Sequence, residues 1–178
     1  PDYMESIWWI AKTLWDKGLI YEGYRVQPYS WAAQTTVSNF EVAQAYRDKT
    51  DTAITIMFRL ENGMNLLVWT TTPWTLPSNL MIAVGEDIDY AVMEEAGEKY
   101  VLAVSLLGRY KKQLEHATQI ATIKGKELVG KSYEPMFPYF ANLKEKGCFR
   151  IISGDFVSTE DGTGMVHIAP GFGAEDFD

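Results

Sequence analysis

Cysteine and histidine are scarce in this chain. Its 178 residues include one cysteine, Cys148, and two histidines, His116 and His167. A single cysteine excludes an internal disulfide, and three residues of these types fall short of the four ligands that a structural zinc site normally uses. We therefore expect a protein that binds no metal.

Long apolar runs are also missing. No stretch approaches the roughly 20 apolar residues that cross a bilayer, and the first residues lack the charged, apolar and small-residue sections of a signal peptide. We expect a cytoplasmic protein with no membrane partner. Its length suits one domain with its own core plus a peripheral arm, and we expect a monomer.

Positive charge is in short supply. The chain has 16 Lys and Arg against 24 Asp and Glu, a formal net charge of -8. Broad affinity for nucleic acid depends on neutralising phosphates, so this balance disfavours a general nucleic-acid-binding protein. The short basic stretches at 109–112 and 124–131 are interpreted as solvated faces. Contact with only the end of a nucleic acid remains compatible with the charge.

Several catalytic signatures do not occur. The sequence contains no GxxxxGK[ST] phosphate loop, GxGxxG dinucleotide fingerprint, GxSxG nucleophile elbow or HExxH metal motif. These absences disfavour nucleotide-binding, covalent-serine and zinc-protease functions.

The first 50 residues have the pattern of a helical and irregular arm. Asp2 and Glu5 form a potential capping box, and apolar residues follow at helical spacing. The tryptophans of this helix indicate either contact with a partner surface or packing in the core, and the sequence leaves both open. Ser38 and Glu41 offer a second capping box.

From residue 51 the pattern changes to short strands, and we predict that residues 51–178 form the core domain. Segments 53–60 and 66–70 flank the turn signal Glu61-Asn62-Gly63, which predicts a hairpin. Further strands are predicted at 80–84, 90–94, 100–104, 119–123, 149–153 and 165–168, and helices at 105–114 and 139–146. Many short strands with few inserted helices predict a mixed α/β domain with a β-barrel-like core and peripheral helices.

The first candidate site is the threonine-rich stretch 69–79. Strand alternation places Thr70 and Thr72 on one side and Thr71 on the other. Pro73 forces Thr72 toward an extended backbone. Hydroxyls beside a rigid backbone suit a polar substrate, although threonine is equally an ordinary strand residue and proline an ordinary strand terminator.

The second candidate site is the stretch 162–177. Its strand places Met165 and His167 on one face, and a glycine-rich turn then leads to Asp176. His167 and Asp176 can therefore meet in one pocket. Each residue alone also fits a purely structural role, His167 as a half-buried histidine and Asp176 as an exposed acid or a helix cap.

Together, these stretches resemble the signatures of the editing domain of the isoleucyl, valyl and leucyl class I aminoacyl-tRNA synthetases. In this family a threonine-rich strand and turn lies across a pocket from a segment GTG-x-V-H-x-A-P-x-x-G-x-x-D-[FY]. Residues 69–79 and 162–177 match both without a gap. The reading Thr-Thr-Thr-Pro-Trp-Thr at 70–75 and His167 are similar to the isoleucyl branch. Residues 23–30 and 38–41 resemble the stretch that joins the catalytic domain to the editing insertion.

This resemblance implies an ester hydrolase that removes valine from mischarged isoleucine tRNA. One methylene is worth about 1–3 kcal/mol in a hydrophobic pocket, a range for which isoleucyl-tRNA synthetase is itself the standard example, so a second site must remove valine. The expected partner is the 3′ end of tRNA(Ile) carrying valine, and hydrolysis of valyl-adenylate is left open.

The same resemblance indicates which cofactors to expect. The family signatures HIGH and KMSKS, which build the ATP site, do not occur in this sequence. We therefore expect neither aminoacylation nor a cofactor for editing, because ATP serves only the catalytic domain, which lies outside this chain.

The resemblance also implies roles for individual residues. Asp176 is expected to bind the substrate α-ammonium as a charge-assisted pair. His167 is expected to line the side-chain end of the pocket and reject isoleucine, and a neutral imidazole there can also orient water. Thr71 and Thr72, with Thr70, would supply hydroxyl or backbone groups to the substrate or the attacking water.

Three further residues complete the expected site. Trp74 and Thr75 would shape the pocket, and Asn79 would contact the terminal adenosine. The sequence shows no Ser-His-Asp or Cys-His constellation, so we expect direct attack by an oriented water. The alternatives are a valyl- or leucyl-type editing domain and a non-catalytic module that binds a peptide or a tRNA end.

Overall fold

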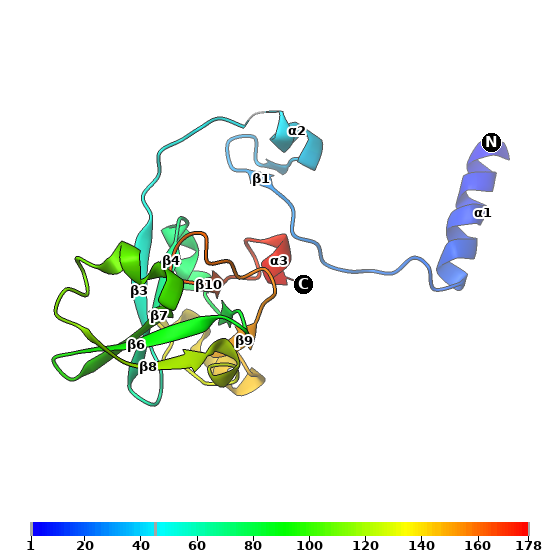
Figure 1. The fold of residues 1–178 in the computed structure, drawn as a ribbon. Coiled ribbons are helices and arrows are strands. Elements are labelled where there is room, and N and C mark those ends of the chain that lie inside the picture. Colours follow the sequence, from blue (N-terminus) through cyan, green and yellow to red (C-terminus); the bar gives the residue numbers. More distant parts are fainter. Residues whose placement is uncertain (1, 45, 178) are drawn as a thin grey trace.

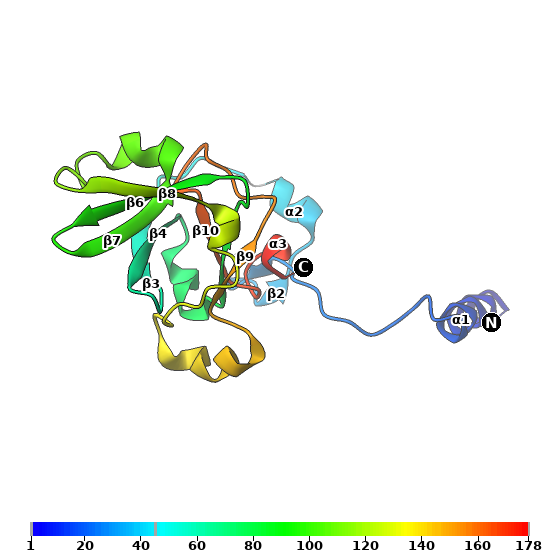
Figure 2. The same ribbon diagram turned by 60° about the horizontal axis from the view of Figure 1, so that its bottom comes forward.

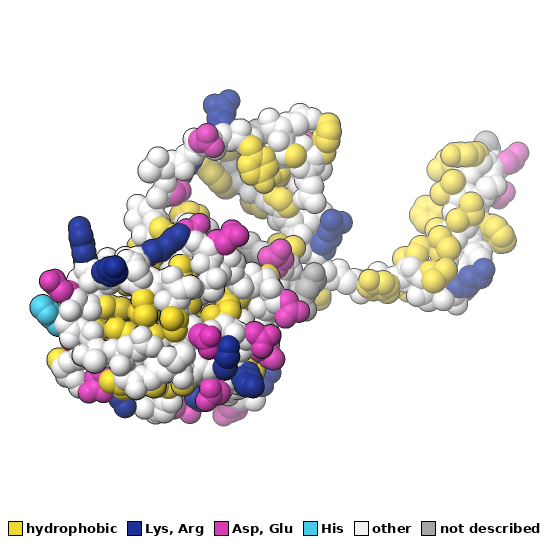
Figure 3. Space-filling model, viewed as in Figure 1, with side chains coloured by type: hydrophobic (Ala, Val, Ile, Leu, Met, Phe, Trp, Pro, Cys, Tyr) yellow, Lys and Arg dark blue, Asp and Glu magenta, His cyan; other side chains and the backbone are white. Residues whose placement is uncertain are grey.

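The N-terminal helix stands apart from the rest of the molecule. The computed structural model describes residues 2–44 and 46–177, and Figures 1 and 2 show α1 (Asp2–Asp16) at the end of a long extended segment. The predicted helix is confirmed, but none of its residues is buried. Trp8 and Trp9 remain 72% and 69% exposed, so this helix does not pack into the core, and its surface is largely apolar in Figure 3.

The second part of the arm folds locally. Strands β1 (Tyr29–Ser30) and β2 (Thr35–Thr36) form a small antiparallel ribbon, followed by α2 (Asn39–Ala43). The capping box expected at Ser38 is confirmed: its hydroxyl accepts from the Glu41 amide at 3.2 Å, and the Glu41 carboxylate accepts from the Ser38 amide at 2.8 Å. The hydrogen bonds that the Ser38 amide and hydroxyl donate to the Glu41 carboxylate lower the pKa of Glu41.

A five-stranded sheet forms the larger half of the core. In spatial order its strands are β3 (Ile54–Arg59), β4 (Met64–Thr70), β7 (Glu98–Ala103), β6 (Asp89–Glu95) and β8 (Thr118–Lys124). β3 and β4 are antiparallel around the predicted turn, which confirms the hairpin, whereas β4 and β7 run parallel. The parallel pair is possible because β5 and β6 lie between these strands in the chain.

A three-stranded sheet forms the other half. Its order is β10 (Met165–Ile168), β5 (Met81–Val84) and β9 (Arg150–Ser153). β10 pairs antiparallel with β5, with His167 opposite Ile82, and β10 also lies against β4 of the larger sheet. The ends of the two motif-bearing strands are thereby brought together.

The core lies between and beneath these sheets. Its largest fully buried side chains include Phe58, Leu66, Ile82, Tyr90 and Tyr133. The mixed α/β class is confirmed, but the expected barrel-like form is not: among the described residues of the core domain, the strands form two open sheets. Closure depends on pairing between distant edge strands, which local patterns do not specify.

The two predicted helices form in the tighter 3₁₀ geometry, and the first of them is also shorter than expected. The helices predicted at 105–114 and 139–146 are the 3₁₀ segments η2 (Val104–Tyr110) and η4 (Pro138–Lys146). η4 is interrupted at Phe140 and ends, as predicted, at a left-handed Gly147 with φ of 91°. The other 3₁₀ segments are η1 (Pro73–Ser78) and η3 (Gly125–Glu127), and a short helix α3 (Ala174–Phe177) ends the described chain. Short segments that cannot complete several i→i+4 bonds commonly adopt 3₁₀ geometry.

A search of the described helices finds none with the length and apolar character required to span a bilayer.

Gly164 fixes the approach of β10 to the larger sheet. Its φ is +74°, and a Cβ there would lie 2.6 Å from the Cβ of Ala103 at the end of β7. The Tyr90 hydroxyl donates to the Gly164 carbonyl at 2.5 Å, and burial raises the pKa of Tyr90 to about 12. The backbone here is therefore held by both a steric and a polar contact.

We expect Gly164→Ala to lower the free energy of unfolding more than Gly97→Ala does. Both glycines have a left-handed φ, which costs an alanine about 1–2 kcal/mol, but only Gly164 also lacks space for a Cβ. Overpacking adds about 1–3 kcal/mol at Gly164. Urea unfolding of the two variants measures the difference, and equal losses would contradict the steric role.

Candidate functional site

A pocket of about 600 Å³ opens where β4 ends beside β10. One wall is the threonine stretch from Trp69 to Thr75. The facing wall is formed by β10 and the loop before it, and Phe172 and Asp176 complete the rim. Both stretches singled out in the sequence thus line the same pocket, although about 90 residues separate them in the chain.

The threonines alternate as strand geometry predicts. Thr70 is buried, Thr71 is exposed and Thr72 is half-buried. The hydroxyls of Thr70 and Thr72 lie 3.2 Å apart, and the Thr72 amide donates to the Thr70 hydroxyl at 3.1 Å. Among the described residues, none forms a side-chain hydrogen bond with the Thr71 hydroxyl, which leaves that group accessible from the pocket.

His167 is bound to the threonine wall. Its Nε2 lies 2.7 Å from the Thr75 hydroxyl, and this hydroxyl donates to the Thr72 carbonyl at 2.8 Å. Both side chains are buried, with 7% of His167 and 5% of Thr75 exposed. Burial lowers the pKa of His167, because desolvation penalises the charged ring, and the nearby charge of Asp176 opposes this effect.

Asn79 lies behind His167 rather than at the pocket surface. It is 5% exposed, and its amide nitrogen is 3.2 Å from His167 Nδ1 and donates to the Met81 carbonyl at 2.9 Å. Its amide oxygen accepts from the Tyr133 hydroxyl at 2.6 Å. The expected contact of Asn79 with a terminal adenosine differs from this environment, because the side-chain amide already forms hydrogen bonds with groups inside the protein.

Asp176 projects from α3 into the rim of the pocket. Its Oδ2 accepts from the Ala169 amide at 2.9 Å, and the side chain is half-buried. Glu160 and Asp161 line the same pocket. Asp176 and Glu160 give the opening a negative potential that favours a cationic group of a ligand, whereas the charge of Asp161 is offset by its ion pair with Arg109. Trp74, 59% exposed, also lines the pocket.

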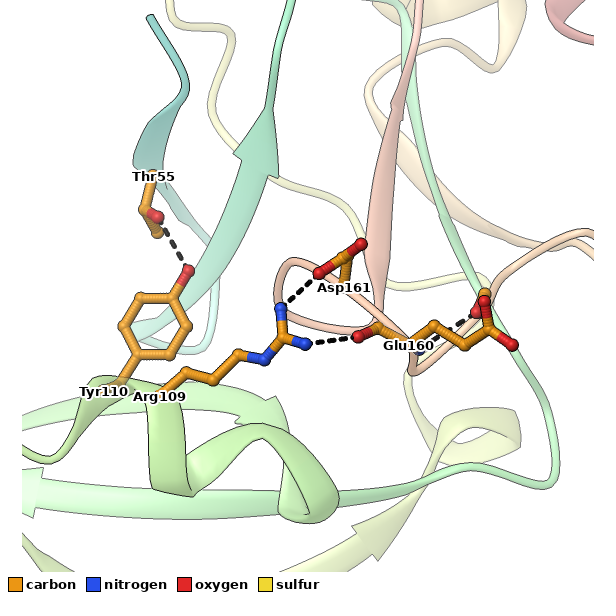
Figure 4. Close-up of polar contacts among 6 residues, drawn as sticks. Thr55, Arg109, Tyr110, Glu160 and Asp161 are labelled. Carbon is orange, nitrogen blue, oxygen red and sulfur yellow. Dashed lines mark hydrogen bonds and ion pairs between the residues drawn. The ribbon is translucent and has the colours of Figure 1, made fainter.

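Arg109 holds the loop that carries two of these carboxylates. Figure 4 shows its guanidinium, from η2, paired with the Asp161 carboxylate, and it also donates to the Glu160 carbonyl at 2.6 Å. The neighbouring Tyr110 hydroxyl lies 2.8 Å from the hydroxyl of Thr55 on β3. The stretch containing Arg109 was expected to be a solvated face, and no local pattern in the sequence indicates this contact with residues 160 and 161.

The arrangement offers hydroxyls, a buried imidazole and a carboxylate. Cys148 is not among the residues that line the pocket. In the described ranges no three His, Cys, Asp or Glu side chains form a group suited to a metal ion. Tyr133, which supports the site from behind, was also missed, because no local motif marks it.

Comparison with known proteins places the chain in a family. The family described as "tRNA synthetases class I (I, L, M and V)" matches residues 1–165. The chain belongs to this family. The match covers the threonine-rich stretch 69–79 and the residues that follow it, and it ends within the second stretch, before His167 and Asp176.

Among these synthetases the chain is similar to isoleucine–tRNA ligases. It is 52% identical over 180 residues to the ligase of Bdellovibrio bacteriovorus, covering 98% of this chain and 17% of the relative. It is 46% identical over 211 residues to the ligase of Treponema denticola, covering 99% of this chain and 19% of the relative. The chain therefore spans less than a fifth of the length of these synthetases.

Solved synthetase structures share the fold. The editing domain of the P. knowlesi cytosolic leucyl-tRNA synthetase superimposes with a TM-score of 0.55 at 15% identity, over 70% of this chain and 60% of that domain. This class I synthetase chain thus has the mixed α/β fold of a synthetase editing domain.

We expect His167 to make stability depend on pH. Its folded-state pKa lies below its usual value of 6.5, so the unfolded chain binds more protons in the window beneath that value. The stabilising contribution of the neutral ring is complete above about pH 6.5 and declines as the pH falls toward the lowered pKa. For the wild type, the urea midpoint of unfolding should be lower at about pH 5.5 than at about pH 7.5.

The two histidines provide the control for this measurement. His116 is exposed, so His116→Gln should retain the decline, whereas His167→Gln should lose most of it. The lowered pKa values of Glu41 and Asp51 act below this window. An unchanged decline in His167→Gln would assign the effect to other groups.

Proposed function

We propose that the chain hydrolyses the ester bond of valyl-tRNA(Ile) and spares isoleucyl-tRNA(Ile). The observation that carries this proposal is the single pocket in which the threonine wall faces His167 and Asp176. The similarity to isoleucine–tRNA ligases, at 46–52% identity, supports isoleucine tRNA as the nucleic acid. Valyl-adenylate carries the same valyl group, so it would be hydrolysed as a second substrate only if it binds in this pocket.

The electrostatics of the pocket favour an aminoacyl ester over an anionic ligand. An aminoacyl ester carries an α-ammonium group beside the carbonyl that water attacks. Asp176 uses Oδ2 to accept from Ala169, which holds the carboxylate in place while it binds that ammonium. Glu160 adds to the negative potential, whereas Arg109 offsets the charge of Asp161. The same charges repel phosphates, so the body of the tRNA must be bound by other parts of the synthetase.

Hydrolysis needs one water and no covalent enzyme intermediate. The water oxygen attacks the ester carbonyl, the bond from that carbon to the ribose oxygen breaks, and the ribose oxygen leaves with a proton. Thr71 and Thr72 present a hydroxyl and backbone groups to the substrate or this water, and Thr70 supports Thr72. A vicinal ribose hydroxyl can assist the proton transfer. Positioning is the main contribution of the protein.

Discrimination by size would come from His167. The buried ring lies in the pocket wall and is bound to Thr75, so it is a firm surface against the side chain of the amino acid. Trp74 and Thr75 shape the rest of that region. Valine then fits, whereas the additional methylene of isoleucine is excluded.

We expect Asp176→Asn to slow valine release from valyl-tRNA(Ile) by roughly 10- to 100-fold, because a charge-assisted hydrogen bond contributes about 1.5–3 kcal/mol. Asparagine can still accept from Ala169, so the variant removes the charge and keeps the local fold. Glu175→Gln is the matched control, since this neighbour does not line the pocket. Unchanged kcat/KM in Asp176→Asn would exclude the ammonium anchor.

We expect His167→Ala to hydrolyse correctly charged isoleucyl-tRNA(Ile) about tenfold or more faster than the wild type. The physical reason is the space that opens when the ring is removed, since one methylene decides between the two substrates. Deacylation of both charged tRNAs is measured in parallel, with His116→Ala as the control. If the variant still spares isoleucyl-tRNA, the steric role of His167 is wrong.

A further inference from the structure

We infer that Asn79 is a positioning residue that fixes His167 as its neutral Nε2–H tautomer, with both ring nitrogens engaged inside the protein. His167 then acts through its shape and cannot accept a proton from water. The structural part of this inference stands on hydrogen-bond geometry, and its consequence for selectivity rests on the proposed function.

The orientation of the Asn79 amide is set by the Met81 carbonyl. The amide nitrogen lies 2.9 Å from that carbonyl oxygen and donates to it. The reversed orientation would bring the amide oxygen against another acceptor, which is repulsive in a buried site. Because Asn79 is the C-terminal cap of η1 and its own backbone amide donates to Leu76, the side chain is also fixed at its base.

Tyr133 supports the same orientation from the other side. Its hydroxyl donates to the Asn79 amide oxygen at 2.6 Å. Burial raises the pKa of Tyr133 far above its usual value of 10, so the hydroxyl keeps its proton. The ring is held by edge-on contacts with Phe58 and Phe149, with centroids 5.3 and 6.0 Å away.

With the amide so oriented, His167 Nδ1 faces an N–H donor at 3.2 Å. Nδ1 must therefore be the unprotonated, accepting nitrogen, and the single ring proton lies on Nε2. Nε2 then donates to the Thr75 hydroxyl at 2.7 Å, and that hydroxyl donates to the Thr72 carbonyl at 2.8 Å. Every bond in the chain from Tyr133 to Thr72 has one donor and one acceptor.

This assignment separates the two roles that the sequence left to His167. A ring that orients or deprotonates water needs a lone pair facing the pocket, but the Nδ1 lone pair faces Asn79 and Nε2 carries the proton. A protonated ring would place an Nδ1–H against the Asn79 amide, so the network disfavours that form too. The ring contributes a rigid surface.

The ring nitrogens of His167 can be observed directly by ¹⁵N NMR. The chain contains only two histidines, and His116→Gln leaves His167 as the single signal. The expected spectrum shows Nδ1 as an unprotonated nitrogen and Nε2 as a protonated one at neutral pH. A protonated Nδ1, or shifts averaged between the two tautomers, would overturn the inference.

Two variants in this background test what sets the tautomer. Asn79→Asp replaces the donor with an acceptor and should move a proton onto Nδ1. Thr75→Val removes the acceptor of Nε2 but keeps Asn79, so it should leave the tautomer unchanged and remains decisive if Asn79→Asp does not fold. A switch in Thr75→Val would assign control to Thr75 instead.

Asn65 provides a matched control. It is also a buried asparagine, at 7% exposed, and its side-chain amide on β4 donates to the Glu98 carboxylate on β7 at 3.0 Å. Asn65→Asp therefore introduces a comparable buried change without touching the His167 network. It should leave the ¹⁵N spectrum of His167 as in the parent, and a shift to protonated Nδ1 would show that the signal is not specific to Asn79.

Deacylation assays connect the tautomer with selectivity. Asn79→Ala should reduce the preference for valyl- over isoleucyl-tRNA(Ile) by about tenfold, the lower end of what one methylene is worth, and Asn65→Ala should not. Intact selectivity in Asn79→Ala would refute the positioning role. If the wild type releases no valine at all, the proposed hydrolysis fails, while the NMR spectrum still decides the tautomer.

Discussion

The antiparallel pairing of β10 with β5 is the constraint on which the site depends. It places His167 opposite Ile82, and β5 begins two residues after Asn79, so the asparagine and the imidazole are brought to the same end of the small sheet. A slip of one residue would turn His167 to the opposite face of its strand. The contact of β10 with β4 then brings this imidazole to the threonine wall.

The distribution of charge explains how an acidic domain can serve a tRNA enzyme. A net charge of -8 is unfavourable for binding a phosphate backbone, but carboxylates are suited to the ammonium of an aminoacyl group. Arg109 has its guanidinium bound to the loop of Glu160 and Asp161, so it contributes order there rather than free positive charge. Exposed pairs of this kind add little stability, about 0–1 kcal/mol, and the arginine matters mainly for where the loop lies.

Local patterns predicted much of the fold and of the site. The hairpin around Asn62, the capping box at Ser38 and the alternation of the three threonines depend on neighbours within a few residues, and each is confirmed. The open sheets, Arg109 and Tyr133 depend on contacts between distant segments. Tyr133 reaches Asn79 across 54 positions, a separation at which residue spacing carries no signal. The sequence therefore marks the pocket wall and Asn79 behind it, but not Tyr133 or Arg109.

Under the proposed function, rigidity behind the wall matters because the selection involves so small a difference. A side chain that distinguishes substrates by one methylene can use a free-energy difference of only about 1–3 kcal/mol. A ring that could rotate or shift would relieve the clash with the larger substrate, and this difference would be lost. His167 is held at both nitrogens, and its partners are themselves held by the Met81 and Thr72 carbonyls. Those carbonyls belong to the backbone, so displacing the ring requires disturbing the chain that forms the pocket. A buried polar network suits this task because every donor in it has one acceptor, and moving any member leaves another unsatisfied.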